Sequence, residues 1–519
     1  MKLLLIRQTN AFYRYSNTSY GLGLIGTLAK EFAAVKIIDN NCLRLTYSIK
    51  DILKIIADFK PDVIGFNVQA FNILATKKLI AAISREFPGI CLLGGGLHTQ
   101  SRPREVADLG VHIVAKGEAD LIIRPLLKAF QAVKGEKIES FRFSDSCLVG
   151  LRKIPGLLFK RGLDEWEDTG EADILYDLDS LPFVDYDLFN LNDYLKSSGD
   201  SHFVTNVLIT QRGCPFKCPF CQGKESNRSN TVRENSLEYK IEYLGYLYDR
   251  YKPSHFVFYD NNFTLNRQAT IDFCRSLVKS PFYKRFTFSC QTNVVIPLDD
   301  ELLSALKAAG CSEVGLGIER LSEDSLRLIR KNKNYQTIRY NIKMLNKHGI
   351  DVMANCLVGF PFDTPQTIRQ ERRLFEEALA DIKVFAINNL IPVPGTEIYE
   401  ETPRKDWYLD EDVMSYKPSF YHMVYNYTNN AWDVNYFGLS EETQEAIGKI
   451  KEHFYDITIS KINSRFINFL HALEKIIAPL SLKLYRLSPL TEDIVFFFFK
   501  RIRLKLRNYF LVKYYLKRG

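Results

Sequence analysis

Hydrophobic and polar positions alternate in a regular way over the first quarter of the chain. Up to about residue 135, short apolar runs are separated by stretches with helical periodicity. This alternation predicts a parallel, doubly wound sheet of the α/β class, with helices on both faces. The expected strands are Lys2–Ile6, Val35–Asp39, Asp62–Asn67, Ile90–Gly94 and Val111–Ala115. Because ligands of such sheets bind beyond the carboxyl ends of the strands, the loops after Asn67, Gly94 and Lys116 are candidate binding loops.

A second run of strand and helix pairs occupies residues 201–395. Six pairs can be placed, which is too few for a complete eight-stranded barrel and indicates a partial, TIM-like (β/α)6 barrel. The expected strands are Phe203–Thr210, Phe256–Tyr259, Phe286–Gln291, Glu313–Ile318, Asp351–Val358 and Val384–Leu390. In parallel barrels the chemistry is carried by loops at the carboxyl ends of the strands.

The remaining segments show weaker patterns. Residues 136–200 read as a linker with a short hairpin around Gly156–Glu167 and a solvated acidic run. Residues 396–519 form a mainly helical C-terminal region, with a long helix expected over Glu441–Leu473. Aromatic residues gather near its start and suit either a flat, apolar substrate or a lid: Trp407, Tyr416, Tyr421, Tyr425, Tyr427, Trp432 and Tyr436.

Three cysteines at close spacing are the strongest chemical signal. Cys214, Cys218 and Cys221 stand in a C-x3-C-x2-C pattern, and Pro215 and Pro219 force the backbone between them into an irregular loop. A closed zinc site needs four protein ligands, whereas a 4Fe–4S cluster held by three thiolates keeps one iron open to a small molecule. A zinc site completed by a distant His, or thiols that only pack, are the alternatives.

Composition indicates the cellular compartment in which this chemistry takes place. The 519 residues carry a net charge of +8, and residues 461–519 hold 13 Lys and Arg against 3 Asp and Glu, so the basic excess is local. Ten cysteines without an extracellular framework indicate a reducing compartment. The first residues turn polar too soon for a signal peptide, and the longest apolar run, Ile494–Phe499, is too short to span a bilayer. We therefore expect a cytoplasmic protein.

One glycine motif suggests a dinucleotide-binding site instead. Gly21-Leu-Gly-Leu-Ile-Gly26 matches G-x-G-x-x-G, and Asp39 follows at a plausible distance for a ribose contact. A dinucleotide fingerprint begins directly after the first strand, yet a polar, Tyr-rich loop intervenes here. We expect these glycines to start a closely packed helix instead.

The cysteine loop resembles the cluster loop of a known family. Arg212-Gly-Cys-Pro-Phe-Lys-Cys-Pro-Phe-Cys221 is similar to the motif of the radical S-adenosylmethionine (radical SAM) superfamily. The resemblance implies that Cys214, Cys218 and Cys221 hold a 4Fe–4S cluster. It also implies that S-adenosylmethionine (SAM) chelates the fourth iron and that Phe220 lies against the adenine.

The N-terminal segment resembles the cobalamin-binding domain fused to many members of that superfamily. The resemblance rests on Asp62-Val-Ile-Gly-Phe-Asn67, the loop Gly94-Gly-Gly-Leu-His98 and Lys116-Gly-Glu118. It implies a corrinoid across the strand ends, and the candidate contacts are Asn67, Gln69, Gly95, Gly96, His98 and Glu118. A D-x-H-x-x-G cobalt-ligand motif is absent between Asp39 and Lys60, which fits a cobalt without a lower His or a domain that has lost its corrinoid. His98 alternatively only caps nearby backbone.

Polar residues follow the predicted barrel strands in the order this superfamily uses to bind SAM. Asp260, Gln291, Glu319 and Arg320 resemble contacts to the methionyl and ribose groups, and Gly359 allows close approach. For each polar side chain the alternative is a helix cap or a structural ion pair. The resemblance covers about residues 2–400.

The resemblance implies a cobalamin-dependent radical SAM enzyme that methylates an unactivated carbon of a small-molecule or lipid-like substrate. A 5′-deoxyadenosyl radical would take a hydrogen from the substrate, and methylcobalamin would deliver the methyl group. An anaerobic tetrapyrrole-type ring cyclase or rearrangement enzyme without methyl transfer is the first alternative. A non-catalytic corrinoid- or membrane-binding module is the second. An electron donor such as flavodoxin or ferredoxin is the expected protein partner.

The basic C-terminal tail mixes bulky apolar residues with cations. Ile494–Leu511 has the composition of an interfacial helix attracted to anionic lipid, which predicts peripheral contact with the inner face of the membrane. The alternatives are a basic helix packed on its own domain and a nucleic-acid contact. Of the possible partners, we expect the membrane surface and not nucleic acid.

Overall fold

The structure is a computed structural model. It describes residues 1–8, 18–40, 47–132, 143–162, 165–191, 207–223, 231–331, 334–378, 380, 382, 384–411 and 435–461. Among these residues, no helix combines the length and the apolar character needed to cross a membrane.

The N-terminal sheet has, within the described residues, seven strands in the order β2-β1-β3-β4-β5-β6-β7. Strands β2 to β5 of this order run parallel, whereas β6 and β7 add an antiparallel hairpin at one edge. The strands are β1 (Lys2–Arg7), β2 (Ala34–Asp39), β3 (Val63–Asn67), β4 (Cys91–Gly95), β5 (Ile113–Ala115), β6 (Leu157–Lys160) and β7 (Trp166–Asp168). The predicted parallel strands and the hairpin are confirmed, with ends shifted by one or two residues.

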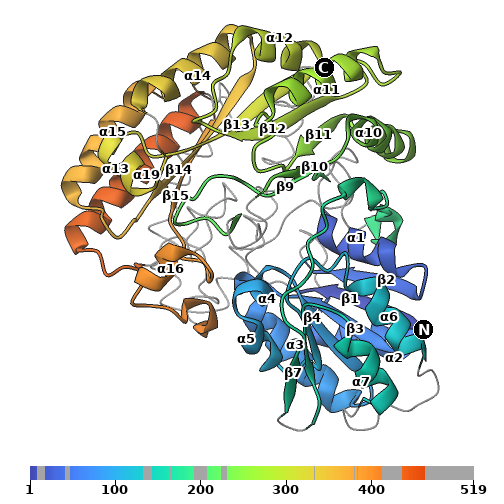
Figure 1. Cartoon of the computed structure of the whole chain (residues 1–519). Helices are drawn as coiled ribbons and strands as arrows, with labels where there is room; N and C mark the ends of the chain where they lie inside the picture. The colour runs from blue at the N-terminus through green and yellow to red at the C-terminus, as the bar shows by residue number, and fades with distance from the viewer. Residues whose placement is uncertain are drawn as a thin grey trace.

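Helices cover both faces of this sheet (Figure 1). They are α1 (Tyr20–Ala29), α2 (Ile49–Phe59), α3 (Ile73–Glu86), α4 (Leu97–Ser101), α5 (Pro103–Ala107), α6 (Ile123–Ala132) and α7 (Asp145–Arg152). Strand β1 shows why both faces must be covered: Leu3 and Leu5 join one buried cluster, and Leu4 and Ile6 join the other. Side chains that alternate between two apolar layers are expected of a central parallel strand.

The glycines of Gly21–Gly26 lie within α1, so the helix predicted there is confirmed. A Cβ atom at Gly23 would lie 2.5 Å from Cγ1 of Val184, and one at Gly26 would lie 2.9 Å from Cδ1 of Leu188. Both glycines therefore let α1 approach the segment after β7, which contains the short 3₁₀ turns η2 (Leu178–Ser180) and η3 (Tyr186–Leu188). The close packing explains the motif without a dinucleotide.

The partial barrel is built, in the part of the chain that the structure describes, from six parallel strands in the order β15-β14-β13-β12-β11-β8. They are β8 (Val207–Leu208), β11 (His255–Phe258), β12 (Thr287–Asn293), β13 (Cys311–Glu319), β14 (Asp351–Val358) and β15 (Val384–Asn389). All six predicted strands are present, although residues 203–206 of the first lie outside the described residues. A small antiparallel pair, β9 (Gln211–Arg212) and β10 (Arg233–Glu234), brackets the cysteine loop.

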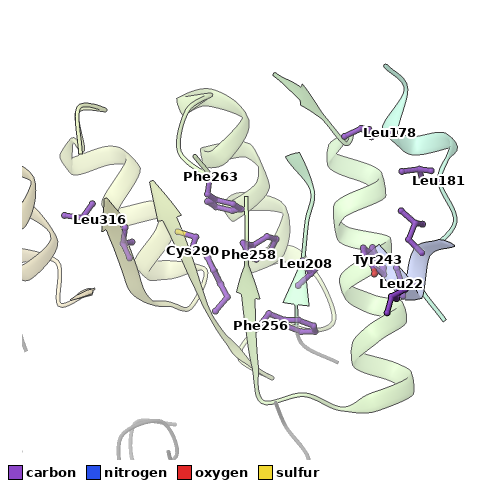
Figure 2. Close-up of a cluster of buried hydrophobic side chains, with 14 of the residues drawn as sticks. Leu22, Leu178, Leu181, Leu208, Tyr243, Phe256, Phe258, Phe263, Cys290 and Leu316 are labelled. Carbon is purple, nitrogen blue, oxygen red and sulfur yellow. The ribbon is translucent and has the colours of Figure 1, made fainter. Parts of the chain in front are cut away.

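The helices of the barrel lie outside its strands (Figure 1). They are α10 (Leu237–Tyr251), α11 (Arg267–Lys279), α12 (Asp300–Ala308), α13 (Glu323–Leu328), α14 (Tyr335–Lys347) and α15 (Pro365–Ala378). Figure 2 shows that the barrel core continues into the N-terminal domain: Phe256, Phe258 and Cys290 pack on the strands, and Tyr243 of α10 reaches toward Leu22 of α1. The two units therefore share one hydrophobic cluster.

The chain returns to the N-terminal domain after the barrel. Helix α16 (Glu397–Glu401) and the turn η5 (Trp407–Leu409) follow β15, and helix α19 (Glu441–Lys461) packs on α15 and β15. Trp407 and Tyr436 are almost fully buried in the cluster that also contains Leu4 and Ile6, so these two aromatics serve packing. The other five predicted aromatics, the end of the Glu441–Leu473 helix and the basic tail lie outside the described residues.

Candidate functional site

The three cysteines lie on the loop that follows β9. Gly213 opens the loop with φ +97°, a conformation that a glycine adopts without strain. A Cβ atom at Gly223 would lie 3.2 Å from Sγ of Cys221 and 4.0 Å from Cβ of Cys214, so these two side chains converge on the glycine. Burial is the main cause that raises the pKa of Cys218 to about 11; the charge of Lys331 opposes the rise, and Cys221, Glu319 and Cys214 add to it. The structure therefore places the three cysteines near one another, although no three His, Cys, Asp or Glu side chains among the described residues are gathered closely enough to hold a single metal ion.

Two N–H groups point at the sulfur atoms. The side-chain Nδ2 of Asn262 donates to Sγ of Cys214 over 3.1 Å, and the backbone N–H of Gly223 donates to Sγ of Cys221 over 3.3 Å. Hydrogen bonds of this kind stabilise thiolates and set the potential of an iron–sulfur cluster. Three converging thiols with such donors fit a 4Fe–4S cluster with one open iron. Asn262 was not singled out from the sequence, although it lies in the polar loop after β11.

Asp260 holds the start of the cysteine loop. Its Oδ1 accepts from the backbone N–H groups of Thr210 (2.6 Å) and Gln211 (2.8 Å), and its Oδ2 accepts from the Thr210 hydroxyl (2.6 Å). The side chain is buried, and this burial raises the pKa of Asp260 to about 6 although the three hydrogen bonds oppose the rise. The structure thus assigns Asp260 a positioning role, while direct contact with SAM stays a prediction.

Glu319 lies beside a lysine that the sequence did not single out. Glu319 ends β13 at a β-bulge with φ +60°, and its Oε1 is 3.5 Å from Nζ of Lys331. Lys331 is almost fully buried, bonds the carbonyl of Gly317 and lowers the pKa of Cys218 by its charge. A buried ammonium next to the thiols suits a carboxylate ligand. No sequence signal separates Lys331 from the basic residues around it.

Arg320 makes a buried ion pair, while its Nε and Nη1 are buried without a hydrogen-bond partner in the described part of the chain. Its Nη2 donates to Oδ2 of Asp363 over 2.5 Å, and its guanidinium lies 4.8 Å from the ring centroid of Phe360. The same Asp363 oxygen accepts from the backbone N–H of Gly359, which has φ +84°. These contacts agree with the alternative assignment of Arg320, in which it forms a structural ion pair. This ion pair shapes the loop after β14. Its assignment to the SAM carboxylate stays a prediction.

Phe220 and Gln291 are predicted SAM contacts, and both assignments stay predictions. The Phe220 ring meets the Phe360 ring edge to face, with centroids 5.8 Å apart. Gln291 is half-buried on β12, and its Cβ lies 3.3 Å from the position a Cβ at Gly315 would take.

The cysteine loop is also held by the segment that follows β15. The carbonyl of Pro219 accepts from the backbone N–H of Ile398, and the side chain of Gln222 donates to the carbonyl of Pro394. Among the described residues, Oε1 of Gln211 and Oδ1 of Asn389 are buried without a hydrogen-bond partner, as a polar ligand would require.

The carboxyl edge of the N-terminal sheet fits a large, mostly apolar cofactor. Asn67 and Gly95 are partners in the β3–β4 ladder, and Oδ1 of Asn67 is buried with no partner in the described part of the chain. A Cβ at Gly95 would meet nothing described within 4 Å, whereas one at Gly96 would lie 2.6 Å from the Val68 carbonyl oxygen. Leu97 next to them exposes 42% of its surface. An open glycine, an exposed leucine and an unpaired amide oxygen suit a corrinoid with amide side arms.

Three predicted corrinoid contacts have other partners. The His98 ring is buried, its Nε2 lies 3.0 Å from Oε2 of Glu105, and it packs on Tyr408 with ring centroids 5.1 Å apart. The backbone N–H of Gln69 donates to Oδ1 of Asn72, a contact at the turn η1 (Ala70–Asn72). Glu118 pairs with Arg233 and Arg212. These contacts are structural, and corrinoid binding by the three side chains stays a prediction.

Two family models match the chain. The Radical SAM superfamily model matches residues 208–375, and the B12 binding domain model matches residues 14–127. The first span covers the partial barrel up to α15, and the second covers strands β2 to β5 of the N-terminal sheet. The class of the protein is thereby defined: it is a radical SAM enzyme with a fused B12-binding domain.

Similar proteins show which reactions occur within this class. A protein named an uncharacterized methyltransferase of Pyrococcus horikoshii is 28% identical over 77% of this chain and 83% of its own length. Cytidylyl-2-hydroxyethylphosphonate methyltransferase of Streptomyces wedmorensis is 23% identical over 87% of this chain and 90% of its own length. An anaerobic magnesium-protoporphyrin IX monomethyl ester cyclase of Cereibacter sphaeroides is 23% identical over 66% of this chain, and the match spans 53% of the cyclase.

The fold is shared with solved structures. The radical SAM methyltransferase TsrM from Kitasatospora setae, solved with cobalamin and a 4Fe–4S cluster, superimposes with a TM-score of 0.60 at 18% identity over 78% of each chain. OxsB, a cobalamin-dependent SAM radical enzyme, gives a TM-score of 0.59 at 16% identity over 72% of this chain and 52% of its own. The chain therefore carries the two domains of a cobalamin-dependent radical SAM enzyme, and its cofactors are a 4Fe–4S cluster, SAM and cobalamin.

Proposed function

We propose that the protein transfers a methyl group to an unactivated carbon of a small-molecule or lipid-like substrate. One observation supports this proposal above the others. The loop that carries Cys214, Cys218 and Cys221 is joined by ion pairs to the loop after β5, at the carboxyl edge of the corrinoid domain. A radical generated at one loop and a methyl donor bound at the other would then reach the same substrate atom.

When bound, the reduced cluster and SAM supply a 5′-deoxyadenosyl radical, and the corrinoid supplies the methyl group. The cysteine thiolates would hold the cluster, and Asn262 would stabilise the charge on Cys214 through its N–H donor. Lys331 would bind the SAM carboxylate, since its ammonium is buried next to the thiols. Glu319 would orient this ammonium and receive a polar group of SAM. Asn67 and Gly95 would meet the corrinoid.

Ring cyclisation is the second candidate, because several relatives are named anaerobic magnesium-protoporphyrin IX monomethyl ester cyclases. The matches to these cyclases span 52–59% of their length. Cyclisation would use the same radical and the same corrinoid domain but would move no methyl group. The two candidates therefore differ in the fate of the SAM methyl group.

The test needs no known substrate. Protein purified without oxygen, reconstituted with iron, sulfide and hydroxocobalamin, is reduced and given methyl-labelled SAM. A methyltransferase should place label on the corrinoid and release 5′-deoxyadenosine only when reductant is present. Label found only in unreacted SAM and in the methionine that its cleavage releases, while 5′-deoxyadenosine forms, would favour the cyclase. The Cys218→Ala variant is the control for cluster-dependent cleavage, and it should hold little iron and release no 5′-deoxyadenosine.

Two partners are further parts of the proposal. We expect a one-electron donor such as flavodoxin or ferredoxin, because SAM cleavage consumes an electron. We also expect a cytoplasmic protein whose basic tail, residues 494–511, contacts an anionic membrane surface, since it interleaves aromatic residues with cations. Co-sedimentation with vesicles that contain phosphatidylserine, compared between the full chain and a chain that ends at residue 461, tests this contact. Equal sedimentation of both chains would refute it.

A further inference from the structure

The corrinoid domain and the cysteine loop are joined by charged side chains rather than by apolar contact alone. Glu118 and Asp120 come from the loop after β5. Arg212 lies on β9, two residues before Cys214, and it faces Arg233 of β10 across the antiparallel pair. We propose that the N-terminal domain is positioned against the 4Fe–4S loop by an ion cluster of four side chains, Glu118, Asp120, Arg212 and Arg233. This inference rests on the proposed function, in which both cofactors act on one substrate.

The contacts within the ion cluster fix orientation as well as distance. Arg212 reaches both oxygens of Asp120, at 2.5 and 3.3 Å, and its Nη1 also lies 3.2 Å from Oε2 of Glu118. Arg233 reaches both oxygens of Glu118, at 2.8 and 2.6 Å. A guanidinium that bonds both oxygens of a carboxylate allows one relative orientation of the two planar groups. The two domains therefore meet in a defined orientation.

Burial makes the ion cluster costly to break. The side-chain exposures are 4% for Arg233, 7% for Asp120, 16% for Arg212 and 18% for Glu118. Two positive and two negative charges balance, so removal of one carboxylate leaves an arginine charge in a poorly hydrated place. Buried ion pairs of this kind add little net stability, and their best-attested contribution is specificity of arrangement. The balanced charges of the ion cluster therefore favour a role in positioning the two domains.

The barrel holds the same short segment from the other side. Asp260 binds the N–H groups of Thr210 and Gln211, the two residues before Arg212. The start of the cysteine loop is thus fixed by Asp260 of the barrel and by Asp120 and Glu118 of the corrinoid domain. A displacement of the loop after β5 is transmitted through Arg212 to the segment that leads into Cys214.

The ion cluster gives Glu118 partners other than a cofactor. Both of its oxygens accept hydrogen bonds from Arg233. Burial opposes ionisation, but these hydrogen bonds and the charge of Arg212 outweigh it and hold the pKa of Glu118 below its usual value. Glu118 therefore acts through the arginines, and it is a positioning residue for the loops on either side.

The test measures the distance between the two metal centres. A reduced 4Fe–4S cluster and cob(II)alamin each carry an unpaired electron, and their magnetic coupling falls with the cube of the distance between them. Electron paramagnetic resonance of the reduced holoenzyme should show one defined coupling. We expect Glu118→Gln and Asp120→Asn to keep full iron and corrinoid while this coupling weakens and spreads. The matched control is Glu167→Gln, because Glu167 pairs with Arg152 inside the N-terminal domain and does not reach the barrel.

Each outcome decides the inference. An unchanged coupling in Glu118→Gln and Asp120→Asn, with both cofactors bound, would overturn it. Loss of corrinoid from Glu118→Gln with normal iron would also overturn it, because Glu118 would then contact the cofactor itself. If Glu118→Gln does not fold, the coupling in Asp120→Asn decides. Absence of corrinoid from the unaltered protein would instead refute the proposed function, so the two failures are distinguishable.

Discussion

Asp260→Asn separates two roles for the carboxylate after β11. The family resemblance suggests a contact with the SAM ammonium, whereas the structure shows three hydrogen bonds to Thr210 and Gln211. An asparagine preserves these hydrogen bonds. Its Oδ1 can accept from both backbone N–H groups, and its Nδ2 can donate to the Thr210 hydroxyl, which turns to accept. We therefore expect Asp260→Asn to keep the cysteine loop in place.

The two roles differ in magnitude. If Asp260 bound an ammonium, loss of its charge would remove a charged hydrogen bond worth about 1.5–3 kcal/mol, which is about 10- to 150-fold in SAM affinity. If it only positions the loop, SAM affinity should change much less than tenfold. Asp260→Ala is the contrasting variant, because it leaves two buried backbone N–H groups unpaired at about 1–3 kcal/mol each. It should lose iron.

The assay is equilibrium dialysis of labelled SAM against anaerobically reconstituted protein, with iron counted in each sample. Asp249→Asn is a matched control, since Asp249 is exposed on α10. An Asp260→Asn variant with full iron and SAM affinity reduced tenfold or more would refute the positioning role. Full iron in Asp260→Ala would refute it as well.

Three further predictions concern single side chains. Asn262→Leu removes the donor to Cys214 and should lower the reduction potential of the cluster by roughly 20–60 mV, measured by redox titration; an unchanged potential would contradict this. Lys331→Met should retain iron but weaken SAM binding about tenfold or more, with Lys331→Arg as the charge-preserving control, and unaltered binding would be the contrary result. Glu313 is buried and lies opposite Asp351 on β14, and burial first, then Asp351, raises the pKa of Glu313 to about 7. Its stabilising contribution, about 3 kcal/mol, is present below pH 4.5 and lost as pH rises through about 7. Thermal unfolding at pH 5 and pH 8 should therefore differ less in Glu313→Gln than in the unaltered protein, and equal differences would disprove the assignment.

The sequence predicted the helices and strands well because the residue patterns that specify them are local. The apolar run Lys2–Ile6 and the alternation in Asp351–Val358 each define a strand from neighbouring residues. Cys214, Cys218 and Cys221 were found because their spacing places all three on one loop. Residue spacing also located Asp260 and Glu118 at the carboxyl ends of their strands.

The partners of those side chains could not be predicted from the sequence. Asp260 binds residues 49 and 50 positions earlier, and Glu118 binds Arg233, which is 115 positions later. His98 packs on Tyr408, a contact that depends on the return of the chain to the N-terminal domain after the barrel. Position along a strand shows which edge a residue occupies, but only the tertiary fold shows whether it faces a cofactor or a neighbouring loop.

The corrinoid domain is attached to both ends of the barrel, and the two attachments differ in chemistry. At the entrance, where β9 and β10 lie next to the cysteine loop, the ion cluster holds Arg212 and Arg233. At the exit, where the chain leaves the barrel after β15, Trp407 and Tyr408 are buried against the N-terminal domain. Tyr408 also donates to Glu105, and the ion pairs Lys78–Glu411 and Arg102–Glu400 lie nearby, so the exit contact combines buried aromatic rings with polar contacts at its margin. A hinge motion that separated the domains would have to expose charges at one end or aromatic rings at the other. Because opening at either end carries such a cost, we infer that the domain arrangement is fixed by the fold.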